Sequence, residues 1–257
     1  MKAIEIAMIG VCAALYAVVG RLTDLGIVAP VVGVVAFWPA AVIPAIFAVL
    51  FGPWTGGTGA AIGIFIRDML FHGDPLLSLS AGVTANFAAF FLIGYISRRE
   101  LNWKKISSGI IIGAAVVSLG FLLPTILLPT ESSGFTGLSA TDSTLLFFAT
   151  VIGSCLLIVA VAFFWPKWRN FGVASVIGLG VGSAIIGVVL WVYSQLFFSP
   201  TGMFITPVPS YFILLWFVWT FATEIPFIIV LGPPILKACY KAIPSLQPQE
   251  TSKEKGQ

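Results

Sequence analysis

The stretch Leu50-Phe-Gly-Pro-Trp-Thr-Gly-Gly-Thr-Gly-Ala-Ala-Ile-Gly-Ile-Phe-Ile-Arg-Asp68 interrupts a series of apolar segments that fills most of the chain. It opens with a turn rich in Gly and Pro and continues as a helix of small residues that ends in the charged pair Arg67–Asp68. Long apolar segments of the kind that flank it are typical of a lipid bilayer. The stretch therefore predicts a turn between two membrane-embedded helices, the second of which carries charge.

The composition extends this prediction to the whole chain. Of the 257 residues, 59% are hydrophobic and only 9% are charged, and the mean hydropathy is +1.06. A soluble domain has about 25% charged residues, and a chain of this length could not hide so much apolar surface from water. The formal net charge of +3 is too small to indicate binding to nucleic acid.

Eight apolar segments are candidates to cross the bilayer as helices. We therefore predict an all-α fold, a polytopic transmembrane bundle of about eight helices. Six or seven spans are the alternative, if the second and third segments form a re-entrant pair; the third is short, and Pro39 and Pro44 are expected to kink the second. The predicted spans are Ile4–Gly20, Val31–Phe51, Thr58–Phe71, Leu76–Ile96, Ile106–Leu128, Leu145–Trp165, Val173–Phe198 and Tyr211–Leu236.

The distribution of charge orients these spans, because the cytoplasmic loops of membrane proteins are enriched in Lys and Arg. With a cytoplasmic N-terminus, only Arg21 and Arg67 of the 13 basic residues lie toward the outside. Eight spans then place both termini in the cytoplasm, and we expect a multi-pass protein of the plasma membrane. Residues 1–242 form the predicted transmembrane domain, and the polar tail 243–257 is predicted to be disordered.

Sequence patterns for catalysis, metal binding and disulfides are missing. The cysteines, Cys12, Cys155 and Cys239, are odd in number and lie in apolar stretches, so neither a disulfide framework nor a metal cage is expected. His72 is the only histidine, and the chain has no His-Glu-x-x-His, Gly-x-Ser-x-Gly or Walker-type motif. We predict no enzymatic activity, cofactor or metal. Transport driven by ATP would need an ATPase on another protein.

Charged residues inside the predicted spans are candidates for function. Glu224 lies near the middle of the eighth span, where an ionised side chain costs about 2.5–3.5 kcal/mol or more. We expect it to face a partner, a polar cavity or water. The alternative is a structural carboxylic acid bonded to a neighbouring helix, at a carbonyl that Pro226 leaves free.

Arg67 and Asp68 lie toward the outer end of the third span. Adjacent residues point about 100° apart on a helix, so each is expected to have a partner other than its neighbour. Arg21 and Asp24, which end the first span on the same side, are the candidates. A purely structural charge cluster under the outer loops is the alternative.

Other polar and aromatic residues also lie within the spans. Asn86 is in the fourth span, and Trp191 and Gln195 are in the outer half of the seventh. Aromatic residues at this depth are typical of the belt at the membrane surface, with stacking on a flat ligand as the alternative.

Pairs of small residues four positions apart predict close contacts between helices in lipid. Packing within the bundle is the simpler interpretation, and docking to another membrane subunit is the functional one. Such pairs are Ala13 with Ala17, Gly59 with Gly63, and Gly178 with Gly182.

These features resemble the substrate-binding (S) subunit of energy-coupling factor (ECF) transporters. Members of that family usually have six helices, fewer than the eight predicted here, and the strongest match covers about residues 8–96. The likeness is carried by Ala13 and Ala17, by the turn Phe51–Gly57, by Gly59–Gly63 and Arg67–Leu70 after it, and by Leu231–Lys237, which resembles the end of the family's last helix.

The resemblance implies a function. Such a subunit captures a vitamin or related micronutrient from outside and docks on a transmembrane coupling subunit, and two cytoplasmic ATPases drive reorientation and release. Ala13 and Ala17 would be the docking residues. The pocket would lie in the outer halves of the helices and the loops. The candidate substrate-binding residues are Arg67, Asp68, Asn86, Gln195, Trp191 and Glu224.

Two other kinds of function remain open. A stand-alone secondary transporter would use Glu224 for proton coupling; prolines such as Pro226 are weak evidence for the broken helices of such transporters, and no repeat is evident. An intramembrane enzyme is disfavoured by the scarcity of acid and base groups, whereas an assembly factor is compatible with the sequence. The identity of the substrate is not indicated.

Overall fold

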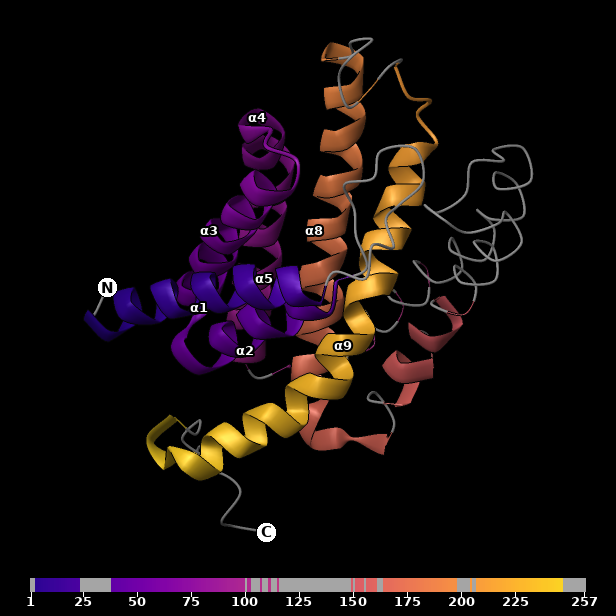
Figure 1. Cartoon of the computed structure of the whole chain (residues 1–257). Coiled ribbons are helices and arrows are strands. Elements are labelled where there is room, and N and C mark those ends of the chain that lie inside the picture. Colours follow the sequence, from indigo (N-terminus) through magenta and orange to yellow (C-terminus); the bar gives the residue numbers. More distant parts are fainter. Residues whose placement is uncertain are drawn as a thin grey trace.

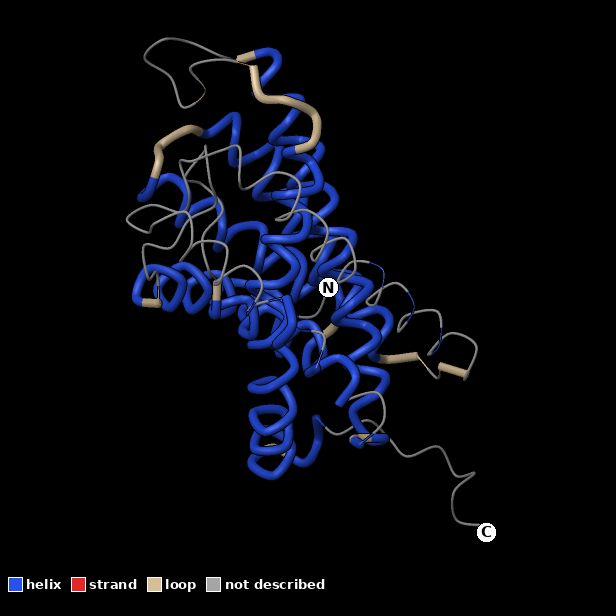
Figure 2. The backbone as a smooth tube through the Cα atoms, turned by 90° about the vertical axis from the view of Figure 1, so that its right-hand side faces the viewer, coloured by secondary structure: helices blue, strands red, loops and turns tan. Residues whose placement is uncertain are grey.

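A computed structural model describes residues 3–23, 38–99, 101–102, 151–154, 156–160, 164–197 and 207–246, together with the single residues 107, 111, 115, 149 and 204. Every regular element within these residues is helical, which confirms the all-α prediction (Figure 2). The α-helices are α1 (Ala3–Leu22), α2 (Val42–Phe51), α3 (Pro53–Phe71), α4 (Pro75–Leu77), α5 (Thr84–Ser97), α8 (Arg169–Leu196) and α9 (Phe212–Ala242). Shorter turns of 3-10 helix are η1 (Pro39–Ala41), η3 (Pro166–Trp168) and η4 (Pro244–Leu246).

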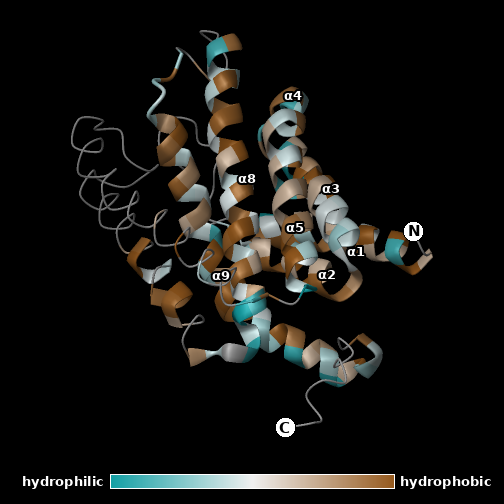
Figure 3. Ribbon diagram, turned by 180° about the vertical axis from the view of Figure 1, so that it is seen from behind, coloured by the Kyte–Doolittle hydropathy of each residue, from teal (hydrophilic) through white to brown (hydrophobic). Residues whose placement is uncertain are grey.

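Four helices in these ranges are long and apolar enough to cross a membrane. They are α1, the continuous helix Pro75–Ser97, α8 and α9. These helices coincide with the first, fourth, seventh and eighth predicted spans. Hydrophobic residues predominate along α8 and the adjoining part of α9, as expected for helices in contact with lipid (Figure 3).

The remaining predicted spans agree less well. η1 and α2 together cover Pro39–Phe51, about 20 Å at 1.5 Å per residue, which is shorter than the ~30 Å apolar core of a bilayer. α3 begins at Pro53 rather than at Thr58, because proline at the first helical position needs no N–H partner. Most of Ile106–Leu128 lies outside the described residues, and Leu145–Trp165 is described only in part.

The turn between α2 and α3 has the geometry that its sequence predicts. Gly52 adopts φ 112°, a conformation that residues with a side chain rarely take, and Pro53 starts the next helix. Arg98, at the end of α5, caps α2: its guanidinium donates hydrogen bonds to the carbonyls of Val49 (3.1 and 3.2 Å) and Leu50 (3.0 Å). This arginine, which the sequence assigns only to the cytoplasmic side, therefore also ties the end of α5 to the turn.

The helices pack in a closed cycle around a central space. α1 packs on α3, α3 on α5, α5 on α8 and α8 on α9, while η1 and α2 contact both α9 and α1. Figure 1 shows α3, α5, α8 and the first part of α9 side by side, with α1 lying across α3. Helices from both ends of the chain therefore border the same central space.

Glycines make the contacts of this cycle possible. A Cβ on Gly63 of α3 would lie 2.8 Å from the carbonyl oxygen of Ala13 on α1, and one on Gly182 of α8 would lie 2.8 Å from Cβ of Ala89 on α5. Such distances leave no room for a side chain, so the helix backbones approach closely, as small residues allow in lipid. For these glycines, packing within the bundle is the interpretation that the structure supports.

We predict that Gly178→Ala destabilises the protein, because the new Cβ would lie 2.6 Å from the Ala89 carbonyl oxygen and 2.6 Å from Cγ1 of Ile93. Overpacking of this kind costs about 1–3 kcal/mol. Gly180→Ala on the same helix is the matched control, because no atom lies within 4 Å of its added Cβ. Thermal unfolding in detergent should show a lower Tm for the first variant and an unchanged or higher Tm for the second. Equal values would contradict the α5–α8 contact.

Candidate binding pocket

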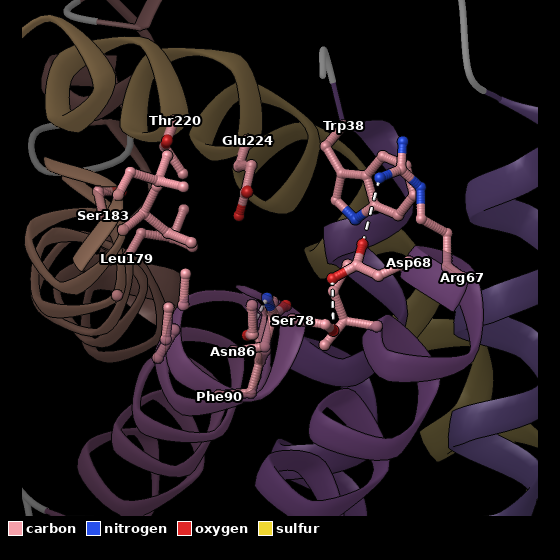
Figure 4. A pocket seen from close by; sticks show the side chains of 18 of the residues that line it. Trp38, Arg67, Asp68, Ser78, Asn86, Phe90, Leu179, Ser183, Thr220 and Glu224 are labelled. Atoms are coloured by element: carbon pink, nitrogen blue, oxygen red, sulfur yellow. Dashed lines mark hydrogen bonds and ion pairs between the residues drawn. The ribbon is translucent and has the colours of Figure 1, made fainter. Parts of the chain in front are cut away.

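A pocket occupies the centre of the cycle (Figure 4). The space between its lining side chains is about 750 Å³, including the part that is open to the outside. Side chains from α1, α3, α4, α5, α8 and α9 line it, together with Trp38 just before η1. An apolar cavity with a few placed polar groups is the usual form of a site for a small molecule.

The charged pair of the opening sequence lies at one end of this pocket, and its partners differ from the expectation. Arg67 and Asp68 do pair with each other: Nη1 of Arg67 lies 3.3 Å from Oδ1 of Asp68, and both residues are buried. The arginine side chain is long enough to reach the neighbouring carboxylate although the two residues point about 100° apart on the helix. Arg21 is exposed, and Asp24 lies outside the described residues. The expectation that the two residues do not pair with each other was wrong, but each of them also has other partners, as expected.

Asp68 has further partners beside the arginine. Ser78 donates its hydroxyl to Oδ2 of Asp68 at 2.7 Å, and Nε2 of His72 lies 3.8 Å from Oδ1. Ser78 is placed by the π-helical turn Ser78–Val83, a wide helical turn of the kind that often occurs at functional sites. Gly82 of that turn leaves room for the carboxylate, since a Cβ there would lie 2.7 Å from Oδ2.

Arg67 is also held between two aromatic rings. Its Cζ lies 4.6 Å from the ring centroid of Trp38 and 4.2 Å from that of Phe71. Cation–π contacts of this kind stabilise a guanidinium that has left water. Together with Asp68, the rings compensate the charge of Arg67 within the bundle.

A chain of hydrogen bonds crosses the pocket wall from Trp38 to α5. Nε1 of Trp38 donates to the Tyr16 hydroxyl at 2.8 Å, and that hydroxyl donates to Oδ1 of Asn86 at 2.6 Å. Nδ2 of Asn86 donates in turn to the carbonyl of Gly82 at 2.9 Å. The sequence indicated Asn86 but not the two aromatic residues. The sequence feature that could have indicated Tyr16 and Trp38 is a hydroxyl or N–H group on an aromatic ring inside an apolar segment, because such a group needs a hydrogen-bond partner when it is buried.

Glu224 enters the pocket from α9, on the side opposite Asp68 (Figure 4). Among the described residues, none donates a hydrogen bond to its carboxyl group or forms an ion pair with it. The carbonyl that Pro226 leaves free is that of Ala222, and the hydroxyl of Ser154 occupies it at 3.0 Å. The structural alternative for Glu224, a bond to this carbonyl, therefore does not describe the structure.

Two other polar residues on the same side escaped the sequence analysis. Ser183 on α8 is 1% exposed, and its hydroxyl has no hydrogen-bond partner within the described part of the chain. Thr220 on α9, one turn before Glu224, donates to the carbonyl of Trp216 at 2.7 Å and keeps its acceptor capacity. Serine and threonine are common in apolar helices, so the sequence does not distinguish these two from the others. Only the packing of α8 against α9 shows that they line the pocket.

Two predicted substrate-binding residues are not among those that line the pocket. Gln195 donates to the carbonyl of Val208 at 2.9 Å and to the hydroxyl of Ser194 at 3.0 Å, which fixes the end of α8. Trp191 lies on the same outer part of α8 and packs beside a separate buried cluster that includes Phe212. Position along the predicted span gave no information on the direction in which these two side chains point.

The predicted docking residues are covered by the bundle itself. Ala13 is 3% exposed and Ala17 is 6% exposed, and the carbonyl oxygen of Ala13 lies against Gly63 of α3. A partner could not reach these two side chains in this arrangement of the bundle. The simpler interpretation of this pair, packing within the bundle, is therefore the one that the contacts support.

A hydrogen bond joins two elements at the end of the bundle that lies beyond Asp68. The Tyr193 hydroxyl on α8 donates to Oδ2 of Asp74 at 2.7 Å, while Oδ1 of Asp74 accepts from the N–H of Leu77 and caps α4. Partial burial raises the pKa of the Asp74 carboxyl. The hydrogen bonds to its charged form lower the pKa, and together with the nearby His72 they outweigh burial, so the pKa lies below its ordinary value of 3.8.

This contact predicts a pH-dependent contribution to stability. A carboxyl with a depressed pKa stabilises the fold above its ordinary pKa, and the contribution is lost as the pH falls through the lowered value. Asp74→Asn should therefore lower the Tm at pH 7, and the difference from the wild type should shrink below about pH 3.8. Thermal unfolding of both proteins across this range is the test. A difference that stays constant with pH would contradict the role of the charge.

No family model, curated protein or solved structure matches the chain. The structure itself therefore defines the class: a helical membrane protein with four described helices apolar enough to span a bilayer and a largely apolar pocket that carries a few polar groups.

Proposed function

We propose that this protein is the substrate-binding subunit of an importer, which captures a small organic solute from outside and delivers it through an ATPase-coupled partner. The observation that carries this proposal is the pocket, a largely apolar cavity with a few polar groups, in which Glu224 has no partner among the described residues. A polar group that is costly in this environment and makes no structural contact is expected to act on a ligand.

The proposed topology has about eight spans, with both termini in the cytoplasm and the protein in the plasma membrane. Two contacts are consistent with it. Arg98 joins the end of α5 to the end of α2, both on the proposed inner side, and Tyr193 joins the end of α8 to Asp74, both on the proposed outer side. In this orientation the Arg67–Asp68 end of the pocket lies toward the outside.

The resemblance to ECF S subunits supports a particular form of this proposal. In that form the solute is vitamin-like, and the partners are a transmembrane coupling subunit and two cytoplasmic ATPases. The absence of a Walker-type motif from the sequence fits a subunit that depends on other proteins for ATP hydrolysis. Ala13 and Ala17 would not meet such a partner directly, because both are buried in the bundle.

Affinity purification of the tagged protein in mild detergent tests this function. Mass spectrometry should find a membrane protein with two ATPases, and a retained small molecule, in the purified material. Ser183→Leu, which fills the pocket from α8, should remove the small molecule, whereas Val181→Leu should not, because Val181 is 39% exposed on the bundle surface. The same small molecule in both variants, or no ATPase where a known complex of this kind survives, would contradict the proposal.

A stand-alone secondary transporter is the second candidate, and the position of Glu224 favours it to the same degree. A carboxyl group that faces a pocket without a structural partner is also the arrangement of a proton-coupling residue. This function predicts uptake by the purified protein alone in liposomes under a proton gradient, abolished by Glu224→Gln. Strict dependence of uptake on an ATPase partner would exclude it.

A further inference from the structure

We infer that the solute is an organic cation, whose positive group binds Glu224 and whose apolar body lies along α5 and α8. This inference deepens the proposed binding function and rests on it. It follows from the charges of the pocket, from the unused hydrogen-bond acceptors beside Glu224, and from the apolar side chains that make up most of the lining.

The charges of the lining residues leave one carboxylate uncompensated. Arg67 and Asp68 form an ion pair at 3.3 Å, and Ser78 and His72 add to the contacts of Asp68. The other charged residue of the described lining is Glu224, which has no cation beside it. With His72 neutral, the pocket therefore carries one net negative charge when Glu224 is ionised.

A cation is the ligand that such a pocket stabilises most. An isolated carboxylate in the membrane interior is costly, and either a proton or a positive ligand group removes that cost. An anionic solute would add a second unpaired charge, and the positive charge of Arg67 is already compensated by Asp68 and by the rings of Trp38 and Phe71. The arrangement therefore selects against anions as well as favouring cations.

The groups beside Glu224 offer acceptors to a ligand that donates hydrogen bonds. Thr220 lies one turn earlier on α9 and uses its hydrogen for the Trp216 carbonyl, so it offers lone pairs. Ser183 faces the same pocket from α8 with a hydroxyl that has no partner within the described part of the chain. An ammonium group has three N–H donors, and this side of the pocket has a carboxylate and two hydroxyl oxygens to receive them.

The rest of the lining fits an organic body and not a bare metal ion. Phe90 of α5 and Leu179 of α8, both buried, line the pocket (Figure 4), and the small residues Ala85 and Ala89 are also part of the lining. Hard cations such as Ca²⁺ take six to eight oxygen ligands. Among the described residues, no group of three His, Cys, Asp or Glu side chains could hold a metal.

Binding of a charge-matched panel to the purified full-length protein tests the inference. The probes are benzene, pyridine and indole rings that carry one aminomethyl, hydroxymethyl or carboxylate group, so that each ring occurs as a cation, a neutral compound and an anion. Shifts in Tm identify binders, and calorimetry gives their Kd. The tightest binder should be an aminomethyl compound, with a Kd at least tenfold below those of its neutral and anionic counterparts.

Variants locate the charge that is responsible. Glu224→Gln keeps the shape of the side chain and should raise the Kd of the cation at least tenfold, while Glu5→Gln, on α1 outside the pocket lining, should leave it unchanged. Ser183→Ala should raise the Kd by a smaller factor, and it serves as the second variant if Glu224→Gln does not fold. An unchanged Kd in both pocket variants would overturn the inference.

The outcomes separate this inference from the proposed function. If a neutral or anionic compound binds best and Ser183→Leu abolishes its binding, the pocket binds solutes but the cation inference is wrong. If no member of the panel binds, the cation inference is wrong. The binding function itself fails only if, in addition, the protein purified from cells retains no small molecule.

Discussion

Asp68 is the residue on which the polar architecture of this membrane protein depends. Its carboxylate meets Arg67, Ser78 and His72, and so joins α3 to the π-helical turn that precedes α5. Without water, a buried charge persists in such a bundle only when partners of this kind surround it. Gly82 is part of the same arrangement, because a side chain there would occupy the position of the carboxylate. The contacts of the Asp68 carboxylate thus position the residues that form one wall of the pocket.

Glu224 shows the opposite arrangement on the facing wall. Asp68 is enclosed by donors, whereas the Glu224 carboxyl faces the pocket without a partner among the described residues. Even the carbonyl that Pro226 frees is occupied by Ser154 and not by Glu224. The contrast between the two carboxylates distinguishes a group that maintains the fold from a group that is available to a ligand. It also accounts for the preference of the pocket for a positive solute.

Much of the fold could be predicted from the sequence, because its physical determinants are local. Apolar segments gave the four long helices, and Gly52-Pro53 gave the turn between α2 and α3. The length of α2 and the start of α3 were less accurate, since proline and glycine positions define a helix end only within a few residues. The direction of single side chains was harder to predict: Gln195 and Trp191 lie outside the pocket lining, and Ala13 is buried within the bundle.

The site could be predicted only where a charged or amide side chain stands out in an apolar segment. Arg67, Asp68, Asn86 and Glu224 are conspicuous in an apolar chain, and the helix cycle does bring them to one pocket. Tyr16, Trp38 and Ser183 have no comparable signal, because aromatic and hydroxyl residues occur throughout membrane helices. Their roles depend on contacts between residues far apart in the sequence, such as the hydrogen bond from Tyr16 to Asn86.

The central claim is that Glu224 faces a pocket that solutes reach from outside the cell. The most direct test is chemical labelling of Glu224→Cys in a variant without Cys12, Cys155 and Cys239, with a membrane-impermeant thiol reagent added to intact cells. Val230→Cys is the control, because Val230 lies on the same helix and is 50% exposed on the bundle surface. The account predicts rapid labelling at position 224 and little at position 230. Labelling at 224 that is no faster than at 230 would contradict it.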